Sequence, residues 1–327
     1  MKVVPKIVSK PAWLSEQPEI EQTKPKIIAA IPAYNEERFI GSMVLKAKKY
    51  VDEVIVIDDG STDSTAEIAR AAGAKIIRHD TNYGKGIAVN AAFKKARDAK
   101  VDILVLLDGD GQHNPFEIPA ILKPILDKKA DVVVGSRFLA SKNSIPKYRI
   151  LGQKILTLVT NLGAKTKLTD SQSGFRAFSK KAIQLMSLRE KGLSVESEMQ
   201  IIISEYNLKV TEVPINVTYT EKSKRSPLAH GFGVLNRVIS MIVERRPLFY
   251  LGIPSMVVFL LGVIIGVAVL NSFVRTGNLP IGSSLVTVLL CIIGILGVFV
   301  SLILNSLKDF VKKLEVSLLE KLEKDHK

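Results

Sequence analysis

Acidic side chains follow three short apolar segments of the chain, each at the point where the segment ends. The first segment runs into Ile31-Pro-Ala-Tyr-Asn-Glu-Glu37, the second into Ile57-Asp-Asp-Gly-Ser-Thr-Asp63, and a later one into Leu107-Asp-Gly-Asp-Gly-Gln-His113. If these segments are parallel strands, their carboxyl ends meet at one edge of the sheet, where open α/β sheets bind ligands. Carboxylates gathered there repel one another unless a cation or ligand donors stand between them. The spacing therefore predicts a cation-dependent binding site.

The third of these turns has the residue types of a divalent metal site. Asp108 and Asp110 can point at one ion, and Gln112 follows beside them. Oxygen ligands of this kind favour Mg²⁺ or Mn²⁺ over zinc, and such ions usually keep substrate phosphate oxygens among their ligands. A single Asp-x-Asp more often serves turn and capping chemistry, but here three acidic strand ends occur in order. We therefore expect Mg²⁺ or Mn²⁺ as cofactor and a diphosphate as ligand.

The elements that would position these side chains alternate along the chain. Apolar segments rich in β-branched residues end in turn residues and are followed by stretches with helical periodicity. Strands are predicted at 27–31, 54–57, 75–78, 103–107 and 131–135, and helices at 36–50, 62–72, 85–98 and 115–128. This order predicts an α/β, Rossmann-like domain with a mostly parallel sheet.

Two long stretches near the C-terminus carry no charged residue. They cover 248–274 and 276–307 and are separated by Arg275. Because about 20 apolar residues suffice to cross the hydrocarbon core of a bilayer, the pair is predicted to form a two-helix transmembrane hairpin. Lys and Arg flank the outer ends of the pair, so the positive-inside rule places the soluble domain and both termini in the cytoplasm. We expect an integral protein of the cell membrane.

The remaining boundaries follow from composition. Residues 1–25 lack the apolar core of a signal peptide and are predicted to be a flexible lead-in to a soluble domain at 26–220. The basic amphipathic segment 221–247 is predicted to lie among lipid headgroups, and the alternative is packing against the soluble domain's core. The cytoplasmic amphipathic tail at 308–327 repeats leucine at helical spacing, as a short coiled coil or a surface-lying helix would, and is compatible with a homo-oligomer or a monomer.

Composition and charge exclude several classes of protein. With 47% hydrophobic and 24% charged residues, the chain must bury a core. A single cysteine excludes an intrachain disulfide, and four histidines without cysteine partners argue against zinc. The net charge of +14 would suit nucleic acid, anionic lipid or phosphorylated substrates. Because the basic residues gather beside the apolar stretches without interleaved aromatics, lipid and phosphate are favoured over nucleic acid.

The three strand-end motifs resemble those of the family-two, A-type fold glycosyltransferases. More narrowly, the chain is similar to the polyprenyl-phosphate (dolichyl-phosphate) hexose synthases through Gly135-Ser-Arg-Phe138, Asp170-Ser-Gln-Ser-Gly-Phe-Arg-Ala-Phe178 and the basic segment 222–237 ahead of the apolar stretches. The resemblance spans roughly residues 26–275. It implies inverting transfer of a hexose from a nucleotide diphosphate sugar to a polyprenyl or dolichyl phosphate in the bilayer, for glycan or glycoprotein assembly.

The resemblance also implies roles for individual residues. Its donor nucleotide site matches Pro32, Tyr34, Glu36, Asp58, Asp59 and Asp108, and its metal site matches Asp108, Asp110 and Gln112. Its acceptor phosphate site matches Arg137, Arg149 and, where Lys222-Ser-Lys-Arg-Ser-Pro227 departs from the family's usual pattern, Arg225. The catalytic positions match Asp110, Arg137 and Asp170.

The implied reaction fits these residue types. A phosphate monoester has its second pKa at about 6, so the acceptor is already dianionic at neutral pH and hardly needs a general base. Positive charge is needed to bring two anionic substrates together, and arginines donate bidentate hydrogen bonds to phosphate. Asp170 is then expected to orient the acceptor or the sugar hydroxyls, with proton removal as the other possibility.

Three alternative functions fit the sequence less well. Processive polysaccharide synthases carry Gln-x-x-Arg-Trp, whereas the one tryptophan here, Trp13, lies in the lead-in. No Gly-x-Gly-x-x-Gly follows the first strand, which argues against a nucleotide-binding oxidoreductase. Gly84-Lys-Gly86 is not a Walker loop, and it is expected to begin a helix near the donor phosphates. A non-catalytic membrane scaffold is the alternative outside enzymes, but the metal-ligand candidates are all present. The sugar, the base and the polyprenol remain open at this stage.

Overall fold

The computed structural model describes residues 24–140, 147–164, 166–218 and 227–325. Its centre is a seven-stranded sheet with the order β3-β2-β1-β4-β6-β5-β7. The strands are β1 (Ile27–Ala33), β2 (Glu53–Asp58), β3 (Lys75–Arg78), β4 (Ile103–Leu106), β5 (Val132–Ser136), β6 (Arg176–Ser179) and β7 (Val210–Pro214). Only β6 runs antiparallel to its neighbours. The expected α/β fold with a mostly parallel sheet is confirmed.

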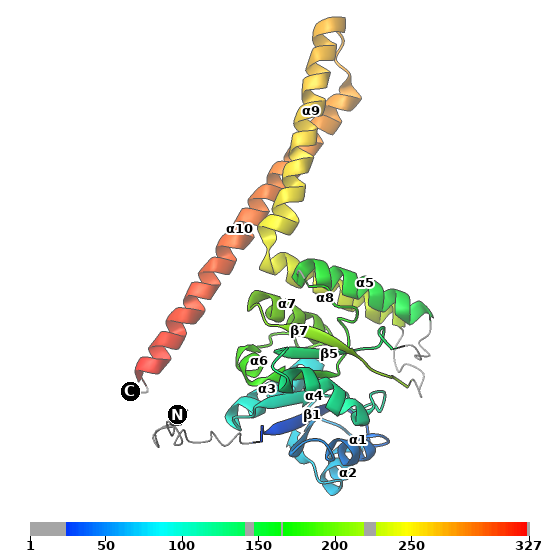
Figure 1. The fold of residues 1–327 in the computed structure, drawn as a ribbon. Coiled ribbons are helices and arrows are strands. Elements are labelled where there is room, and N and C mark those ends of the chain that lie inside the picture. Colours follow the sequence, from blue (N-terminus) through cyan, green and yellow to red (C-terminus); the bar gives the residue numbers. More distant parts are fainter. Residues whose placement is uncertain (1–23, 141–146, 165, 219–226, 326–327) are drawn as a thin grey trace, which may run out of the picture.

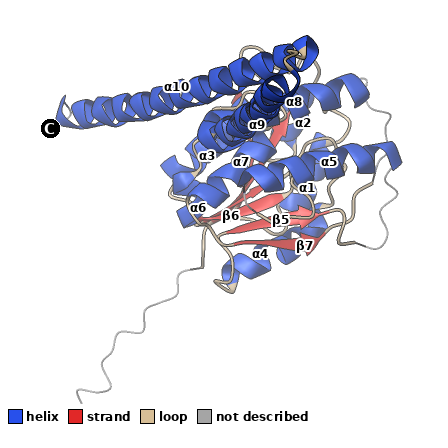
Figure 2. Cartoon of the chain, turned by 90° about the horizontal axis from the view of Figure 1, so that it is seen from above, coloured by secondary structure: helices blue, strands red, loops and turns tan. Residues whose placement is uncertain are grey.

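Helices cover both faces of this sheet (Figures 1 and 2). Alternate residues of β1 point to opposite faces; Ile31 joins one buried apolar cluster and Ile28 the other. The first cluster includes α1 (Ile40–Ala47), α2 (Thr65–Ala71) and α4 (Ile118–Leu126). The second includes α3 (Lys85–Asp98), α6 (Lys180–Leu185) and α7 (Val195–Glu205). Since β1 is buried on both faces, it holds the strand ends of the predicted site rigidly.

Helix α1 begins four residues later than its periodicity predicts. Asn35 has a positive φ of 55°, and the connection after β1 is bonded to the loop after β2. The backbone N–H of Asn35 donates to Ser61 Oγ at 2.9 Å, and that of Glu36 donates to Thr65 Oγ1 at 2.8 Å. These long-range bonds, invisible to periodicity, keep 34–39 as a loop at the sheet edge.

Strand β6 lies between β4 and β5, which separates two strands that follow one another in the chain. The sequence analysis did not predict β6, β7, α6 or α7. Strand β6 has four residues only, and its side chains are buried on both faces apart from its last residue. A segment so short and without alternation of polar and apolar residues gives no period-2 signal.

A pair of helices, α5 (Lys147–Ala164) and α8 (Pro227–Arg245), lies across the end of the domain (Figure 1). Val238, Met241 and Ile242 of α8 are buried together with Ala164 of α5 and Ile201 of α7. Within the predicted interface segment 221–247, Val238, Met241 and Ile242 thus pack against the domain, while Ile239 of the same helix is 44% exposed. Residues 221–226 lie outside the described part.

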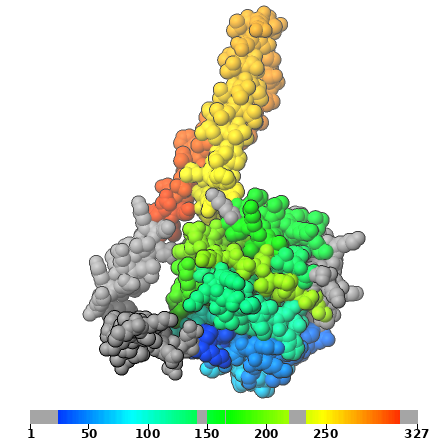
Figure 3. Space-filling model, viewed as in Figure 1, coloured from blue at the N-terminus to red at the C-terminus, as the bar shows by residue number. Residues whose placement is uncertain are grey.

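From α8 the chain passes through a short π-helical segment (η3, Leu248–Gly252) into a helical hairpin of α9 (Ile253–Thr276) and α10 (Ile281–Asp325). The hairpin stands out from the domain (Figures 1 and 3). Two stretches in it, Leu248–Thr276 and Ile281–Val311, are long and apolar enough to cross a membrane, and only 11% of each is buried. Such exposure is opposite to that of a soluble protein's core helix.

Helix α10 runs without a break through the predicted tail at 308–327, as far as Asp325. The tail is therefore a continuation of the second apolar helix and not a separate element. The reason is local: no glycine or proline occurs after Gly297, so nothing interrupts the helix at the change from apolar to charged residues.

Candidate functional site

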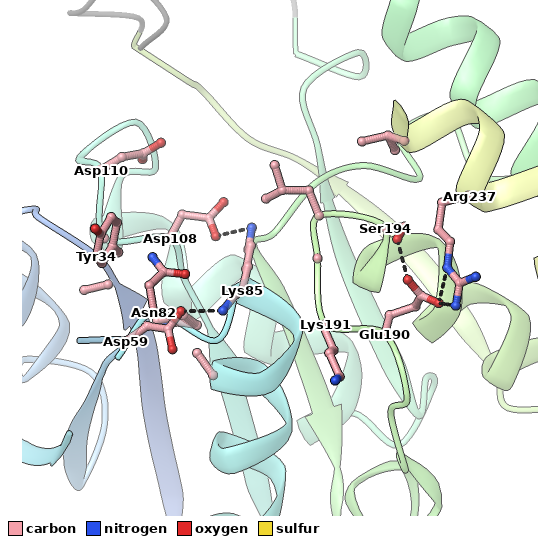
Figure 4. Close-up of a pocket in the computed structure, with 18 of the residues that line it drawn as sticks. Tyr34, Asp59, Asn82, Lys85, Asp108, Asp110, Glu190, Lys191, Ser194 and Arg237 are labelled. Carbon is pink, nitrogen blue, oxygen red and sulfur yellow. Dashed lines mark hydrogen bonds and ion pairs between the residues drawn. The ribbon is translucent and has the colours of Figure 1, made fainter. Parts of the chain in front are cut away.

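The ends of β1, β2 and β4 lie side by side and open into one cavity of about 870 Å³. This is the size of a small-molecule site. From the sheet side it is lined by the end of β1, the loops after β1, β2, β3 and β4, and the start of α3. These residues are Pro32, Ala33, Tyr34, Glu36, Asp59, Asn82, Gly84, Lys85, Asp108, Gly109 and Asp110. Figure 4 shows several of them pointing into the same space. The tertiary structure thus brings the predicted strand-end motifs together.

The turn after β4 holds Asp108, Asp110 and Gln112. Gln112 donates to Asp110 twice, from its backbone N–H at 3.0 Å and from its side-chain amide at 2.7 Å. Burial raises the pKa of Asp110, and the negative charge of Asp108 adds to this effect. His113 lies beneath the turn, and its Nδ1 accepts from the backbone N–H of Asp108. Burial lowers the pKa of His113, which keeps its ring neutral.

Lys85 is the cation nearest to this pair of aspartates in the described residues. Its Nζ lies 2.6 Å from Asp108 Oδ1 and 2.7 Å from Glu196 Oε1. Burial would lower the pKa of Lys85, but the charges of Asp108 and Glu196 outweigh burial and raise it. Burial would likewise raise the pKa of Asp108, but Lys85 lowers it to about 2. Asp108 is therefore held ionised and pointed into the cavity.

Two glycines allow a second loop to close over Lys85. Gly84 has a φ of +99°, and a Cβ there would collide with the carbonyl oxygen of Lys191. A Cβ at Gly86 would collide with the carbonyl oxygen of Glu190, and the Gly86 N–H donates to Lys191 O at 2.9 Å. The loop 189–194, which lines the far side of the cavity, is thus docked on the start of α3.

We expect Gly86→Ala to weaken nucleotide binding at least tenfold, because the new methyl group must push loop 189–194 away from the cavity. Gly152→Ala is the matched control, since Gly152 does not line the cavity and nothing stands within 4 Å of the added Cβ. Titration of a nucleoside diphosphate against both variants checks this. Equal affinities would mean that the loop does not help to form the site.

The two aspartates at the end of β2 hold the architecture of the site. Asp59 lines the cavity, but its carboxylate already accepts from the backbone N–H groups of Tyr83 and Gly84 and pairs with His79 at 2.7 Å. Asp58 is fully buried outside the lining, where it accepts from the N–H of Ser61. Both therefore shape the loops on the strand-end side of the cavity.

Arg137 and Asp170 form a bidentate ion pair beneath the site. Arg137 Nε lies 2.6 Å from Asp170 Oδ2, and Nη2 lies 2.7 Å from Oδ1. Asp170 is fully buried and Arg137 is 8% exposed. Burial raises the pKa of Asp108, Lys85 is the main group that lowers it, and Arg137 also lowers it, so the charge of Arg137 reaches the metal-site candidates. The structure thus brings two of the three predicted catalytic residues into direct contact.

The other predicted acceptor residues are placed less fully. Arg149 belongs to α5, and its side chain lies outside the described part, as does all of Arg225. In their stead, α8 brings Arg237 to the cavity. Its Nε donates to Glu190 Oε1 at 2.8 Å, and Glu190 also accepts from Ser194 Oγ at 2.8 Å.

Sequence reasoning did not single out Lys85, Glu190, Glu196 and Arg237 as members of one site. Gly84-Lys-Gly86 was expected to begin a helix near the donor phosphates, and α3 does begin at Lys85, but the two carboxylate partners of Lys85 were not predicted. Arg237 was assigned only to the basic segment 222–237, and no contact with the cavity was predicted for it. Local spacing carries no signal for contacts such as Glu190 with Arg237, which lie 47 residues apart.

Comparison with known proteins gives a consistent result. The sequence profile described as "Glycosyl transferase family 2" matches residues 28–186. The chain is 35% identical over 239 residues to "UDP-N-acetylglucosamine--dolichyl-phosphate N-acetylglucosaminyltransferase" of Methanococcus voltae, covering 66% of this chain and 95% of that protein. It is 30% identical to "Dolichyl-phosphate hexose transferase" of Haloferax volcanii, covering 69% and 98% respectively.

Among solved structures, glucosyl-3-phosphoglycerate synthase from Mycobacterium tuberculosis, in complex with Mn²⁺, UDP and glucosyl-3-phosphoglycerate, has a similar fold. The TM-score is 0.54 at 24% identity, and the match covers 73% of this chain and 86% of that one.

Proposed function

Because the chain belongs to glycosyltransferase family 2, we propose that this enzyme moves a hexose from a nucleotide diphosphate sugar to a membrane polyprenyl phosphate. We further propose that the transfer inverts the configuration at the anomeric carbon and that the product is a lipid-linked monosaccharide. The similarity to the dolichyl-phosphate transferases of Methanococcus voltae and Haloferax volcanii supports the acceptor class.

One observation carries the proposal: the same cavity is lined by the acidic strand ends and by the helix that leads into the apolar hairpin. Asp108 and Asp110 stand on one side, and Gly233, Val234 and Arg237 of α8 stand on the other. Helix α8 is followed directly by η3 and α9, so a substrate held in a bilayer around the hairpin would meet the cavity at the α8 side. A nucleotide sugar would enter from the strand ends.

The residues of the β4 turn fit a divalent ion. Asp108 and Asp110 would supply two carboxylates, the hard oxygen ligands of Mg²⁺ or Mn²⁺, whereas Gln112 lies outside the cavity lining and donates its side-chain amide to Asp110. Two protein carboxylates with the remaining positions left to substrate phosphates and water are typical of such nucleotide sites. The bound ion would neutralise charge on the departing nucleoside diphosphate. Lys85, fixed beside Asp108, would add a second positive charge next to the same phosphates.

Asp170 is proposed to position Arg137. Both of its carboxylate oxygens accept from Arg137, and it has no exposed surface, so an external hydroxyl cannot approach it without breaking the ion pair. Arg137 in turn would present its charge to the acceptor phosphate, with Arg149 and Arg225 as further candidates. A dianionic acceptor attacks without a general base, so no proton needs to reach Asp170.

The transfer assay tests the proposal directly. The enzyme, purified in detergent, is incubated with Mn²⁺ or Mg²⁺, polyprenyl phosphate and one radiolabelled donor at a time: UDP-N-acetylglucosamine first, then UDP-glucose and GDP-mannose. Label extracted into organic solvent with one donor establishes the reaction and the sugar. Failure with all donors, in protein that binds nucleotide, would contradict the lipid phosphate as acceptor or point to another donor.

We expect Arg137→Ala to raise the KM for polyprenyl phosphate at least tenfold more than the KM for the nucleotide sugar, because the proposed role of the lost charge is to attract the acceptor phosphate. Since the variant leaves Asp170 buried without its partner, Arg137→Lys is the control that keeps the charge and loses the bidentate geometry. A larger effect on the nucleotide sugar in both variants would contradict the acceptor role.

A further inference from the structure

Arg176 is the largest fully buried side chain in the described part of the chain. It is the first residue of β6, and 0% of its surface is exposed. A charged side chain is almost never buried so completely unless it is paired, because leaving water is costly. Its nitrogen Nη1 meets no hydrogen-bond acceptor within the described residues. An apolar residue would fill the same space at a lower cost, so Arg176 is not explained by stability alone.

The other two nitrogens of Arg176 hold the turn that precedes β6, residues 170–174. Nη2 donates to the carbonyl oxygen of Ser171 at 2.6 Å, and Nε donates to the carbonyl oxygen of Ser173 at 2.9 Å. Because the guanidinium is planar and rigid, its two donors keep a constant separation. The two carbonyl oxygens, and with them turn 170–174, are therefore fixed by one rigid group.

The first residue of turn 170–174 holds Arg137. Asp170 accepts two hydrogen bonds from the guanidinium of Arg137 and a third from its backbone N–H at 3.1 Å. Just before the turn, Thr169 Oγ1 lies 2.6 Å from Ser136 Oγ. A shift of the turn would therefore carry Arg137 with it.

The last residue of turn 170–174 lies against the metal-site candidate Asp108. A Cβ at Gly174 would collide with both carboxylate oxygens of Asp108. The carboxylate therefore rests on the bare backbone of this glycine, on the side opposite to no other substituent that could replace it without a shift. The same turn thus touches Asp108 at one end and, through Asp170, Arg137 at the other.

The order of the sheet explains why one turn reaches both groups. Strand β6 runs antiparallel between β4 and β5, so its first residue lies near the carboxyl ends of its neighbours. Arg176 is paired with Leu106 on one side and with Val134 on the other. Asp108 follows Leu106 by two residues, and Arg137 follows Val134 by three. Arg176 therefore stands between the metal-site turn and the predicted acceptor arginine.

The charge of Arg176 acts on the same two groups. Burial lowers the pKa of Arg176, while the carboxylates of Glu196 and Asp170, and more weakly those of Glu212 and Asp108, raise it. By the same interactions, its positive charge stabilises the ionised forms of Asp170 and Asp108.

We propose that Arg176 is a positioning residue, which through turn 170–174 sets the distance between the carboxylate of Asp108 and the guanidinium of Arg137. In the proposed reaction these two groups hold the departing diphosphate and the attacking acceptor phosphate, which must meet at a fixed separation. Arg176 touches neither substrate, because it has no exposed surface. The inference rests on the proposed function for the role of Arg137, whereas its metal half depends on Asp108 alone.

Arg176→Lys tests the inference, because lysine keeps the charge but lacks the rigid fork that reaches two carbonyl oxygens. On the full chain in detergent, titration gives the Kd for Mn²⁺, and initial rates give the KM for polyprenyl phosphate. Arg97→Lys is the matched control. Arg97 of α3 likewise donates to two carbonyl oxygens, those of Ile183 and Met186, but lies outside the cavity lining.

We expect Arg176→Lys to raise both constants about tenfold, the usual cost of one lost hydrogen bond from a charged group. Arg97→Lys should leave both constants unchanged. A thermal scan of the two variants measures the loss of stability that each substitution causes. If Arg176→Lys lowered only the melting temperature and left both constants unchanged, Arg176 would be a structural residue and the inference would be overturned.

Gly174→Ala tests the same turn without touching Arg176, and it decides the inference if Arg176→Lys does not fold. The added methyl group must displace Asp108, so the Kd for Mn²⁺ should rise, again by about tenfold. Unchanged Mn²⁺ affinity in Gly174→Ala would contradict the contact that the inference requires. An absence of transfer in the wild type would overturn the proposed function, whereas the Mn²⁺ titration, which needs no transfer, would still distinguish a positioning role of Arg176 from a structural one.

Discussion

Replacing Asp110 by Asn should reduce transfer on the order of 10³-fold while leaving the protein folded and in the membrane. Metal assistance to a departing diphosphate is worth several kcal/mol, and each 1.36 kcal/mol is a factor of ten in rate. The substitution preserves the shape of the side chain and one oxygen acceptor for Gln112 but removes the charge that an ion needs. Initial rates with lipid phosphate and nucleotide sugar measure the loss.

Asp127→Asn is the matched control for this experiment. Asp127 is exposed at the end of α4, pairs only with nearby lysines in the described structure and does not line the cavity. Its removal should change the rate less than twofold. A direct measurement of Mn²⁺ affinity by titration separates loss of the metal from loss of chemistry. Full activity of Asp110→Asn, or unchanged Mn²⁺ affinity, would contradict the metal site.

Replacing Lys85 by Met should destabilise the metal-free protein by about 3 kcal/mol and abolish high-affinity donor binding. Breaking a buried ion pair on one side leaves uncompensated charge, here on Asp108 and on Glu196, whose side chain is 4% exposed. A thermal scan in detergent without divalent metal measures the loss of stability. A titration with a nucleoside diphosphate measures the loss of affinity.

A second measurement on Lys85→Met tests whether Lys85 and a metal ion both stabilise the ionised form of Asp108. If Lys85 and a metal ion both stabilise the ionised Asp108, then Mn²⁺ should raise the melting temperature of Lys85→Met more than that of the wild type. Lys75→Met is the control, because Lys75 pairs with Glu53 at 2.7 Å but is 68% exposed, and exposed pairs contribute little. If Mn²⁺ raised the melting temperatures of the wild type and of Lys85→Met equally, the idea that Lys85 and the metal ion both stabilise ionised Asp108 would be contradicted.

Much of the fold could be predicted because its signals are local. The core strand β1 reads as a continuous apolar run, as a parallel strand buried on both faces must. The uncharged stretches near the C-terminus are long enough to require helices in any environment that buries them from water. The Asp108 and Asp110 turn is likewise contiguous, so its residue types alone indicated a divalent cation. Strand β6, with four residues, lacked such a signal.

What the sequence by itself determined is therefore which segments between 27 and 135 are strands and helices, which later stretches are long apolar helices, and which turn carries Asp108 and Asp110. The tertiary structure alone decided which charges face each other: Lys85 with Asp108 and Glu196, and Arg137 with Asp170. It also decided that Val238, Met241 and Ile242 of α8 are buried against the domain. The physical reason is that periodicity reveals an apolar face but not its neighbour, since contacts between distant segments depend on how the whole chain packs.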